Sequence, residues 1–366
     1  MLLLAVNGGS SSVKCALFTY SADPALVERT VINGTGAESI PALLAWVDAH
    51  TARSAIAAIG HRVVHGGPNY TEPQAISHQL RDDLVGLVPF APNHLPDEIA
   101  IIDALADREP GIPQVACFDT AFHRHIPDVA RRLPIPASYD RRGVRRYGFH
   151  GLSYTFLMEE LSRIAGPDAA RARVVLAHLG NGSSLAAVQR GVSIDTTMAF
   201  TPIGGVLMST RSGDLDPGVV TYIGRADALS ADQLEEILSA QSGLLALSGT
   251  SGDMQQLLAR ERDDTAARLA VRAYVYSVVK AIGGFAAVLG GLDTLVFSGG
   301  IGEHAATIRA RICDPLAFLG VSLDPAANEA HAGVISGVTS GATVRVIPTN
   351  EELMIARATY RVVAAG

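Results

Sequence analysis

The chain has 366 residues, of which 48% are hydrophobic and 18% are charged, and its formal net charge is −7. This length is enough for two domains, and the apolar content excludes a disordered chain. The negative charge, without any run of Lys or Arg, argues against a nucleic-acid-binding surface. The three cysteines form no C-x-x-C pair, which favours buried thiols in a reducing compartment.

The sequence shows no sign of secretion or of a membrane span. The N-terminus has no basic region and no cleavage site, and the longest uncharged apolar stretch, 281–292, is too short to cross a bilayer. We therefore expect a cytoplasmic protein that binds neither membranes nor nucleic acid.

The first part of the chain alternates strand and helix patterns. The predicted strands are 2–6, 13–20, 25–33, 56–65 and 115–118. Helical periodicity occurs at 39–50 and at 97–108, where Asp97 and Glu98 suit a helix N-terminus. A loop rich in Arg and Pro, 131–146, then separates the two halves.

The second part repeats this organisation. The predicted strands are 174–179, 184–189, 295–297 and 344–347, and the predicted helices are 152–164, 231–240, 263–289 and 351–363. Because strand–turn–strand units followed by helices occur in both halves, the sequence predicts an α/β architecture of two related domains with a cleft between them.

Two Gly/Ser turns between apolar runs share one design. They read NGGSSSVK over 7–14 and HLGNGSS over 178–184. Such turns bring backbone N–H groups and small hydroxyls close to phosphate oxygens. One copy is ordinary hairpin chemistry, but two in corresponding places indicate a duplicated fold that holds one polyphosphate from both sides. A third glycine turn, 298–302, follows a buried strand and suits a nucleotide close to the backbone.

Two arginines are candidates for binding an anion. Arg62 projects from the end of an apolar strand, where its partner is either a local carboxylate or an anionic ligand. Arg211 lies in a polar loop among small residues, and Asp214 and Asp216 in that loop are expected to cap the following helix.

Histidines and carboxylates complete the candidate chemistry. His150 and His178 stand beside glycine turns, where a histidine is either structural or functional. Asp119 and Glu351 follow strands, as suits Mg²⁺, although the helix dipole alone would also favour Glu351. No Cys/His spacing indicates a zinc site.

Taken together, these segments resemble the acetate kinase (acetokinase) family, within the sugar-kinase, Hsp70 and actin superfamily. The matching segments, in order along nearly the whole chain, are 7–14, 61–67, 118–123, 147–151, 178–184, 210–217, 297–303 and 349–352. The resemblance implies two duplicated ribonuclease-H-like (actin-type) domains with a catalytic cleft between them. Residues 1–120 plus 352–366 would form the acyl and phosphoryl side, and 121–351 the nucleotide side.

The resemblance also implies an activity. It is the reversible, Mg²⁺-dependent, direct in-line transfer of the ATP γ-phosphoryl group to acetate, giving acetyl phosphate and ADP, with Mn²⁺ as a possible substitute metal. A carboxylate is already ionised at neutral pH, so this acceptor needs relief of charge repulsion and no general base. The family is commonly homodimeric, so we expect a homodimer.

Two alternatives stay open. A propionate or broader short-chain acyl kinase has the same motifs. From another class, an actin- or Hsp70-like ATPase module would use the same fold, but its arginines and histidine would then have no purpose.

The resemblance assigns residues to roles. The implied catalytic residues are Asp119, His150 and Arg211. The implied substrate-binding residues are Arg62, Val64, Asn93, Phe149 and Pro202. The implied metal neighbours are Asn7 and Glu351. The implied ATP-binding residues are Ser10, Ser12, Lys14, His178, Asn181, Gly182, Asp253, Gly299, Gly300, Ile301 and Gly302.

The chain departs from the family pattern at three positions. Asn93 stands where an apolar residue would line the acyl pocket, Gly204 replaces a glutamate, and Ser209 replaces a glycine. An amide at position 93 either admits a more polar acyl group or turns away from the pocket, so these changes bear on the substrate more than on the reaction.

Overall fold

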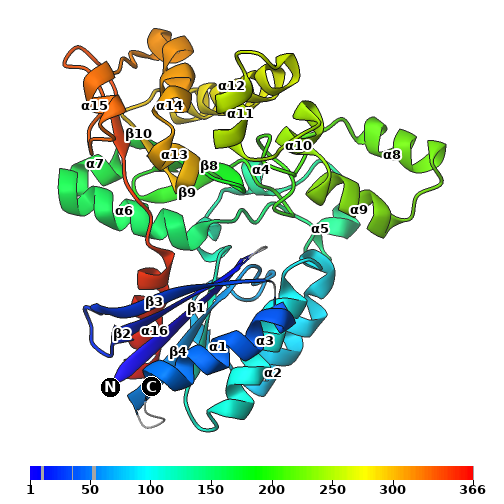
Figure 1. Ribbon diagram of the computed structural model, residues 1–366, viewed down its shortest axis with the longest axis vertical. Coiled ribbons are helices and arrows are strands. Elements are labelled where there is room, and N and C mark those ends of the chain that lie inside the picture. Colours follow the sequence, from blue (N-terminus) through cyan, green and yellow to red (C-terminus); the bar gives the residue numbers. More distant parts are fainter. Residues whose placement is uncertain (10–11, 35, 52–54, 366) are drawn as a thin grey trace. The chain divides into compact units, whose positions relative to one another are not determined.

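The computed structural model describes residues 1–9, 12–34, 36–51 and 55–365, which divide into two compact units. Unit 1 comprises Met1–Arg124, Phe149–Phe156 and Asn350–Gly366, and unit 2 comprises His125–Gly148 and Leu157–Thr349. Both termini belong to unit 1 (Figure 1). The sequence-based division differs, since it assigned 121–124, 149–156 and 350–351 to the second domain. Segment 149–156 joins unit 1 because the Gly151 amide donates a hydrogen bond to the Asp119 carbonyl oxygen at 2.9 Å.

Unit 1 is built on a six-stranded sheet of order β3-β2-β1-β4-β6-β5. Its strands are β1 (Leu2–Gly8), β2 (Ser12–Thr19), β3 (Leu26–Asn33), β4 (Ile56–Val63), β5 (Gln74–Ala75) and β6 (Gln114–Phe118). Strands β1, β2 and β3 form an antiparallel meander, and β4 and β6 continue the sheet parallel to β1. Because β1, β4 and β6 are parallel, their carboxyl ends lie at one edge of the sheet.

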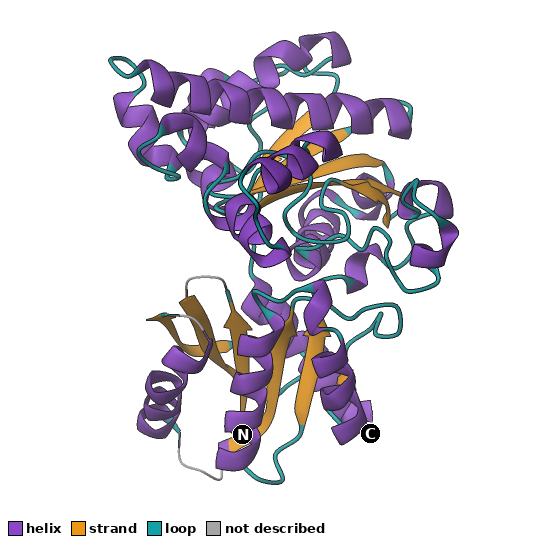
Figure 2. Cartoon of the chain, turned by 90° about the vertical axis from the view of Figure 1, so that its right-hand side faces the viewer, coloured by secondary structure: helices purple, strands orange, loops and turns teal. Residues whose placement is uncertain are grey.

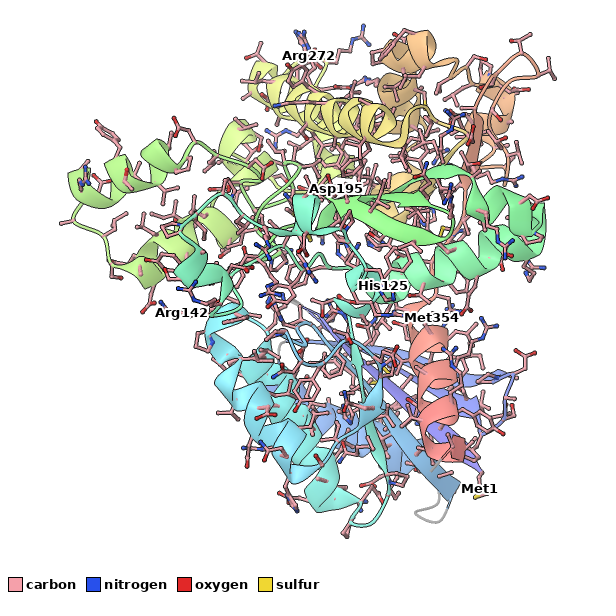
Figure 3. All side chains as sticks on the ribbon, turned by 180° about the vertical axis from the view of Figure 1, so that it is seen from behind. Met1, His125, Arg142, Asp195, Arg272 and Met354 are labelled. Atoms are coloured by element: carbon pink, nitrogen blue, oxygen red, sulfur yellow. The ribbon has the colours of Figure 1, made fainter. Side chains whose placement is uncertain are left out.

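Helices cover both faces of this sheet (Figures 1 and 2). Alternate β1 side chains such as Leu3 pack against α16 (Glu351–Ala365), which carries Met354, labelled in Figure 3. The intervening side chains, such as Leu4, pack against α1 (Gly36–His50) and α3 (Leu95–Arg108). Since successive strand side chains point to opposite faces, a sheet buried on both sides reads as a continuous apolar run.

Unit 2 repeats the topology with a five-stranded sheet of order β11-β10-β7-β8-β9. Its strands are β7 (Arg173–Leu179), β8 (Ser183–Gln189), β9 (Val192–Thr196), β10 (Thr294–Ser298) and β11 (Thr343–Val346). As in unit 1, an antiparallel meander is followed by two strands parallel to its first strand. The duplication predicted from the two Gly/Ser turns is therefore confirmed by the sheets.

The longest helix, α12 (Thr265–Leu289), forms part of the unit 2 core. Asp264 caps its start by accepting from the amides of Ala266 and Ala267, and Gly290 ends it at a φ of 73°. By length and composition α12 alone among the described helices could cross a membrane. Its buried side chains, Val271 and Tyr274 among them, contact the sheet of unit 2, which accounts for the apolar composition.

The remaining elements surround these cores or contribute side chains to them. The helices are α2 (His78–Gly86), α4 (Asp128–Arg131), α5 (Ala137–Asp140), α6 (Gly151–Ala165), α7 (Pro167–Arg171), α8 (Pro217–Ala226), α9 (Ala231–Ala240), α10 (Gly243–Ser248), α11 (Met254–Arg260), α13 (Gly299–His304), α14 (Ala306–Cys313) and α15 (Pro325–Glu329). In the part of the chain that the structure describes, the 3₁₀ helices are η2 (Val88–Phe90), η3 (Ala121–His123) and η4 (Asp314–Leu319). All three cysteines are buried and free, as the sequence predicts.

Two local predictions are corrected. The segment 298–302, expected to be a glycine turn, is the start of helix α13, and only Gly299 turns the chain, at a φ of 75°. Of the two aspartates expected to cap α8, Asp216 does so by accepting from the Gly218 amide at 2.8 Å. Asp214 instead accepts from the Gly205 amide at 2.7 Å, because the preceding loop folds back on itself.

Candidate active site

Arg62 is the centre of a buried polar cluster at the carboxyl edge of the unit 1 sheet. Its Nε and Nη2 donate to Asp119 Oδ2 at 3.0 and 2.7 Å, and its Nη1 donates to the Gly8 carbonyl oxygen. Its side chain is 12% exposed, and that of Asp119 is fully buried. Both residues occupy the ends of parallel strands, so the sheet itself brings together positions far apart in the sequence. The carboxylate partner anticipated for Arg62 is thus Asp119.

Glu98 belongs to the same cluster, although the sequence assigned it only to a helix N-terminus. Its Oε2 accepts from the Val64 amide at 2.9 Å, and its Oε1 lies 3.7 Å from Arg62 Nη1. Burial raises the pKa of the Glu98 carboxyl to about 7, against the opposing effect of the Arg62 charge. No local pattern identifies Glu98, because its partners come from another strand.

Asn7 connects the cluster to helix α16. Its Nδ2 donates to Glu351 Oε2 and to Glu352 Oε1, each at 2.9 Å. Burial, together with the negative charge of Asp119, raises the pKa of Glu351. Glu352, which was not among the residues predicted from the sequence, is therefore part of the same acidic group.

This acidic group fits a divalent cation that keeps much of its water. Asp119 Oδ1 is buried and has no hydrogen-bond partner within the described residues. Asn7 uses only its amide nitrogen in the bonds above, and carboxylates outnumber Arg62 as the charged groups nearby. Among the described residues, no three or more His, Cys, Asp or Glu side chains are arranged to hold a metal directly. Mg²⁺ needs no such cage, since it binds through one or two carboxylates together with water and phosphate.

The backbone at His150 is linked to that of Asp119. It has a φ of 59°, in the left-handed region that non-glycine residues rarely occupy, and it precedes the Gly151 amide that bonds to Asp119. A Cβ at Gly151 would lie 2.0 Å from the Asp119 carbonyl oxygen, so only glycine fits this contact. His150 is thus held in a strained conformation next to the buried aspartate.

The predicted acyl-pocket residues of unit 1 are partly apolar and partly exposed. Val64 and Phe149 are each 1% exposed. Asn93 is exposed and lines a cavity of about 10 Å³ together with Gly8 and Glu98. The departure from the family pattern at position 93 therefore lies beside the Arg62 cluster.

The first Gly/Ser turn closes between β1 and β2. The Gly9 amide donates to the Ser12 carbonyl oxygen at 2.9 Å, and Lys14 is the exposed strand partner of Asn7. Ser10 lies outside the described residues.

Unit 2 contains a separate cavity of about 620 Å³ behind the second Gly/Ser turn. Asn181 lines it together with Asp253, which also caps α11, and with Gly300 and Ile301 of α13. Gly299 is required at the entrance to α13, since a Cβ there would meet the Leu179 carbonyl oxygen at 2.7 Å. This volume is in the range of small-molecule and cofactor sites.

The remaining predicted residues of unit 2 surround the same turn. His178 is the last but one residue of β7 and the strand partner of Ser298, and the Asn181 carbonyl oxygen accepts from the Ser209 amide at 3.1 Å. Ser209 also donates through its hydroxyl to the Gly252 carbonyl oxygen at 2.7 Å, which ties the Arg211 loop to the segment before Asp253. Gly182, between Asn181 and β8, is part of this turn.

Arg211 and Pro202 are brought together in unit 2. Arg211 Nη1 donates to the Pro202 carbonyl oxygen at 3.2 Å. Gly204 lies beside Asp214, since a Cβ at Gly204 would lie 3.4 Å from Asp214 Oδ1.

Arg309 was not predicted from the sequence, and it supports the unit 2 cavity from behind. It is fully buried, and its Nη1 donates to the carbonyl oxygens of Gly302 and Glu303, each at 2.9 Å. Its Nε donates to Asn328 Oδ1 at 2.8 Å, and its Nη2 also contacts His331, a residue of the cavity wall. Burial lowers the pKa of Arg309. The guanidinium thus fixes α13 against α15.

A carboxylate–arginine cluster in one α/β unit and a glycine-walled cavity of nucleotide size in its duplicate are features of phosphotransferases. Comparison with known proteins identifies one family. Residues 28–357 match the model of the Acetokinase family, and the chain belongs to that family.

The chain is also similar to individual kinases of known sequence or structure. The chain is 42% identical to an acetate kinase of Rhodopseudomonas palustris over 396 aligned positions, covering 100% of this chain and 99% of the relative. It is similar to the crystal structure of Porphyromonas gingivalis acetate kinase, with a TM-score of 0.88, 34% identity and 99% of each chain covered. It is equally similar to a propionate kinase from Francisella tularensis, with a TM-score of 0.89, 34% identity and 99% of each chain covered.

These findings confirm the predicted fold and enzyme class. The two duplicated α/β domains are of the actin type, and the enzyme is a phosphotransferase with a carboxyl group as acceptor. Family membership also implies ATP and a carboxylate as small-molecule substrates, together with a divalent metal.

Proposed function

We propose that this protein is an acetate kinase, which transfers the γ-phosphoryl group of ATP reversibly to acetate and releases acetyl phosphate and ADP. The observation that carries the proposal is the Arg62 guanidinium, held by Asp119 and Glu98 at the end of a buried strand. A cation fixed in that way suits a small carboxylate, which needs charge neutralisation to approach a triphosphate.

The chain's own residues account for the remaining needs of the reaction. Arg211, in a loop tied to the second Gly/Ser turn, would hold the transferring phosphoryl group. His150 would donate a hydrogen bond to the charge that spreads over the phosphoryl oxygens in the transition state. Asp119 would keep Arg62 oriented, and no general base is required because the acceptor is already ionised.

We assign the metal as Mg²⁺, near Asn7 and Glu351. Bound there with phosphate oxygens and water, Mg²⁺ would neutralise charge on the triphosphate. The unsatisfied Asp119 Oδ1 and the Asn7 amide oxygen support this assignment.

ATP would occupy the unit 2 cavity. Its phosphates would lie at the second Gly/Ser turn, near His178, Asn181 and Gly182, and its adenosine between Asp253 and α13. Lys14, Ser10 and Ser12 would serve the transferring phosphoryl group from the first turn. By the same resemblance we propose a homodimer in the cytoplasm.

The decisive experiment supplies ATP, Mg²⁺ and a panel of carboxylates, and traps the acyl phosphate with hydroxylamine. We expect hydroxamate from acetate. If no short acid gives hydroxamate, the acyl-kinase proposal is wrong. ATP hydrolysis that is independent of any acid would instead favour the actin- or Hsp70-like alternative.

Asn93 bears on the choice between acetate and propionate as the acceptor. The family likeness extends equally to a propionate kinase, so overall similarity does not separate the two acids. An amide beside Glu98 gives a longer acyl chain less apolar contact, which favours acetate.

We expect Asn93→Leu to raise the ratio of propionate to acetate turnover by about tenfold, the usual worth of one methylene in an apolar pocket. The measurement is kcat/KM for both acids in the native protein and the variant. An unchanged ratio would mean that Asn93 does not line the acyl pocket.

A further inference from the structure

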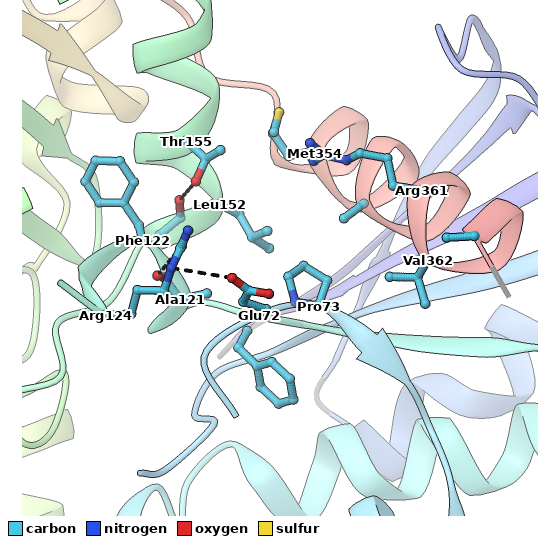
Figure 4. Close-up of a pocket in the computed structure, with 14 residues that line it drawn as sticks. Glu72, Pro73, Ala121, Phe122, Arg124, Leu152, Thr155, Met354, Arg361 and Val362 are labelled. Atoms are coloured by element: carbon cyan, nitrogen blue, oxygen red, sulfur yellow. Dashed lines mark hydrogen bonds and ion pairs between the residues drawn. The ribbon is translucent and has the colours of Figure 1, made fainter. Parts of the chain in front are cut away.

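Unit 1 contains a second cavity that the proposed reaction does not use. Its volume is about 460 Å³, and Figure 4 shows the side chains that surround it. The walls come from the chain after β4, from η3, from the start of α6 and from α16. None of the residues assigned to acetate, ATP or metal lines it.

The walls are apolar at their base and cationic at two places. Phe118, Leu152 and Met354 are buried side chains that supply apolar surface. Arg124, directly after η3, and Arg361 of α16, both labelled in Figure 4, contribute guanidinium groups.

The charges in this cavity do not cancel. Arg124 lies 3.8 Å from Glu72, whose side chain is 70% exposed. Arg361 forms no ion pair with any residue that the structure describes. Among the lining side chains that the structure describes, one positive charge therefore remains beside apolar surface, a combination that suits an organic anion with an apolar body.

The cavity wall is continuous with the candidate active site. Phe118 precedes Asp119 in the chain, and Met354 lies one turn after Glu351 on α16. The Gly151 amide, on the wall, donates to the Asp119 carbonyl oxygen, and there is no room for a Cβ between them. A ligand that displaces this wall would therefore also displace Asp119.

We propose that this cavity binds a small organic anion with an apolar body, and that its occupation changes the rate of phosphoryl transfer. The binding site stands on the cavity alone, whereas the effect on rate rests on the proposed function.

The binding experiment uses benzenesulfonate, which carries an anion on an aromatic ring and has no carboxylate to accept a phosphoryl group. Benzyl alcohol is the neutral comparison. Titration calorimetry is carried out on the full chain with ATP and Mg²⁺ present, so that the phosphate sites are filled. We expect benzenesulfonate to bind with a Kd of roughly 1 mM or tighter, and benzyl alcohol to bind at least tenfold more weakly.

Two variants on the same helix locate the site. Arg361→Met removes the unpaired guanidinium and should weaken benzenesulfonate binding roughly tenfold. Arg357→Met is the matched control, because Arg357 lies one turn earlier, does not line the cavity and faces Asp23 at 3.6 Å; it should leave binding unchanged. Val362→Trp, which fills the cavity from a half-buried position, provides a second way to abolish binding.

Absence of binding, equal binding of the neutral compound, or equal loss in both arginine variants would each overturn the proposed site. The rate of hydroxamate formation should change with benzenesulfonate in the native chain and not in Arg361→Met; an unaffected native rate overturns the link to catalysis. If no acid gives hydroxamate at all, the proposed function fails, while the calorimetric contrast between Arg361→Met and Arg357→Met still decides the site.

Discussion

At the scale of single residues, the candidate active site depends on side chains held by partners distant in sequence. Arg62 is oriented by Asp119 and Glu98, and Asn7 by Glu351 and Glu352. Arg211 lies in a loop of unit 2, where its Nη1 donates to the carbonyl oxygen of Pro202. Since it is assigned to the transferring phosphoryl group, its removal should affect the chemistry directly.

We expect Arg211→Ala to lower kcat about a thousandfold, the usual cost of removing one group that stabilises transition-state charge. Binding of ADP, measured by calorimetry, should stay within a few fold of the native value. Exposed Arg225 of α8 provides the control, and Arg225→Ala should leave both quantities unchanged. Near-native turnover in Arg211→Ala would remove Arg211 from the proposed mechanism.

The raised pKa of Glu98 predicts how the free energy of unfolding depends on pH. Its pKa rises from the ordinary value of 4.5 to about 7 in the folded chain, so the folded state keeps a proton that the unfolded chain releases between these values. The contribution to the free energy of unfolding is thus fully present below pH 4.5 and is lost as pH rises to 7, by about 3 kcal/mol in all.

Glu98→Gln should remove this loss while keeping the bond from the Val64 amide. The measurement is urea unfolding of both proteins without metal at pH 5 and pH 8. The difference in stability between variant and native chain should shift in favour of the variant at the higher pH. A difference that does not change with pH would show that Glu98 titrates normally.

At the scale of elements, short helices hold the cavity walls where strands end. In unit 2, α13 begins directly after β10, and Arg309 fastens its last residues to α15. A six-residue helix has little stability of its own, so it depends on such contacts.

Arg309→Met should raise the KM for ATP by tenfold or more and leave the KM for acetate nearly unchanged, because α13 lines only the unit 2 cavity. Loss of the buried guanidinium should also cost about 3 kcal/mol of stability, since several carbonyl oxygens lose their donor. Arg309→Lys keeps the charge without the fork of donors, so its KM for ATP and its stability should lie between those of the native chain and of Arg309→Met. Equal changes in both KM values would argue against a positioning role confined to the ATP site.

At the scale of the whole molecule, one sheet topology occurs twice, and each copy takes a different task. The strand ends of unit 1 collect carboxylates around an arginine, whereas those of unit 2 carry glycines beside an open cavity. Duplication accounts for the two Gly/Ser turns, and divergence of the strand ends accounts for their different surroundings.

We expect the whole chain to associate as a homodimer. Sedimentation velocity over a wide range of concentrations should give a species of two chains at micromolar concentration, as expected of a dimer with a specific interface. A single-chain species at every concentration would contradict the expectation from the family resemblance. Arg211→Ala, whose side chain lies in a ligand loop, should sediment like the native chain.

The sequence by itself determined much of this protein. Apolar runs and helical periodicity predicted the main strands and helices to within a few residues, because burial on one or both faces sets the spacing of apolar residues. The family motifs also predicted roles for Arg62, Asp119, Asn7 and Glu351, and the structure places each of them near a strand end or at a helix start.

Only the tertiary structure decided which of these side chains meet. Glu98 reaches Arg62 from a helix more than thirty residues along the chain, and Arg309 reaches α13 and α15 from α14. Neither contact has a local sequence signal, because each is created by the packing of separate elements. The cavity bordered by Phe118, Gly151 and Met354 likewise exists only once β6, α6 and α16 are packed together. Residue spacing sets the elements, but buried ion pairs and cavities depend on how those elements pack.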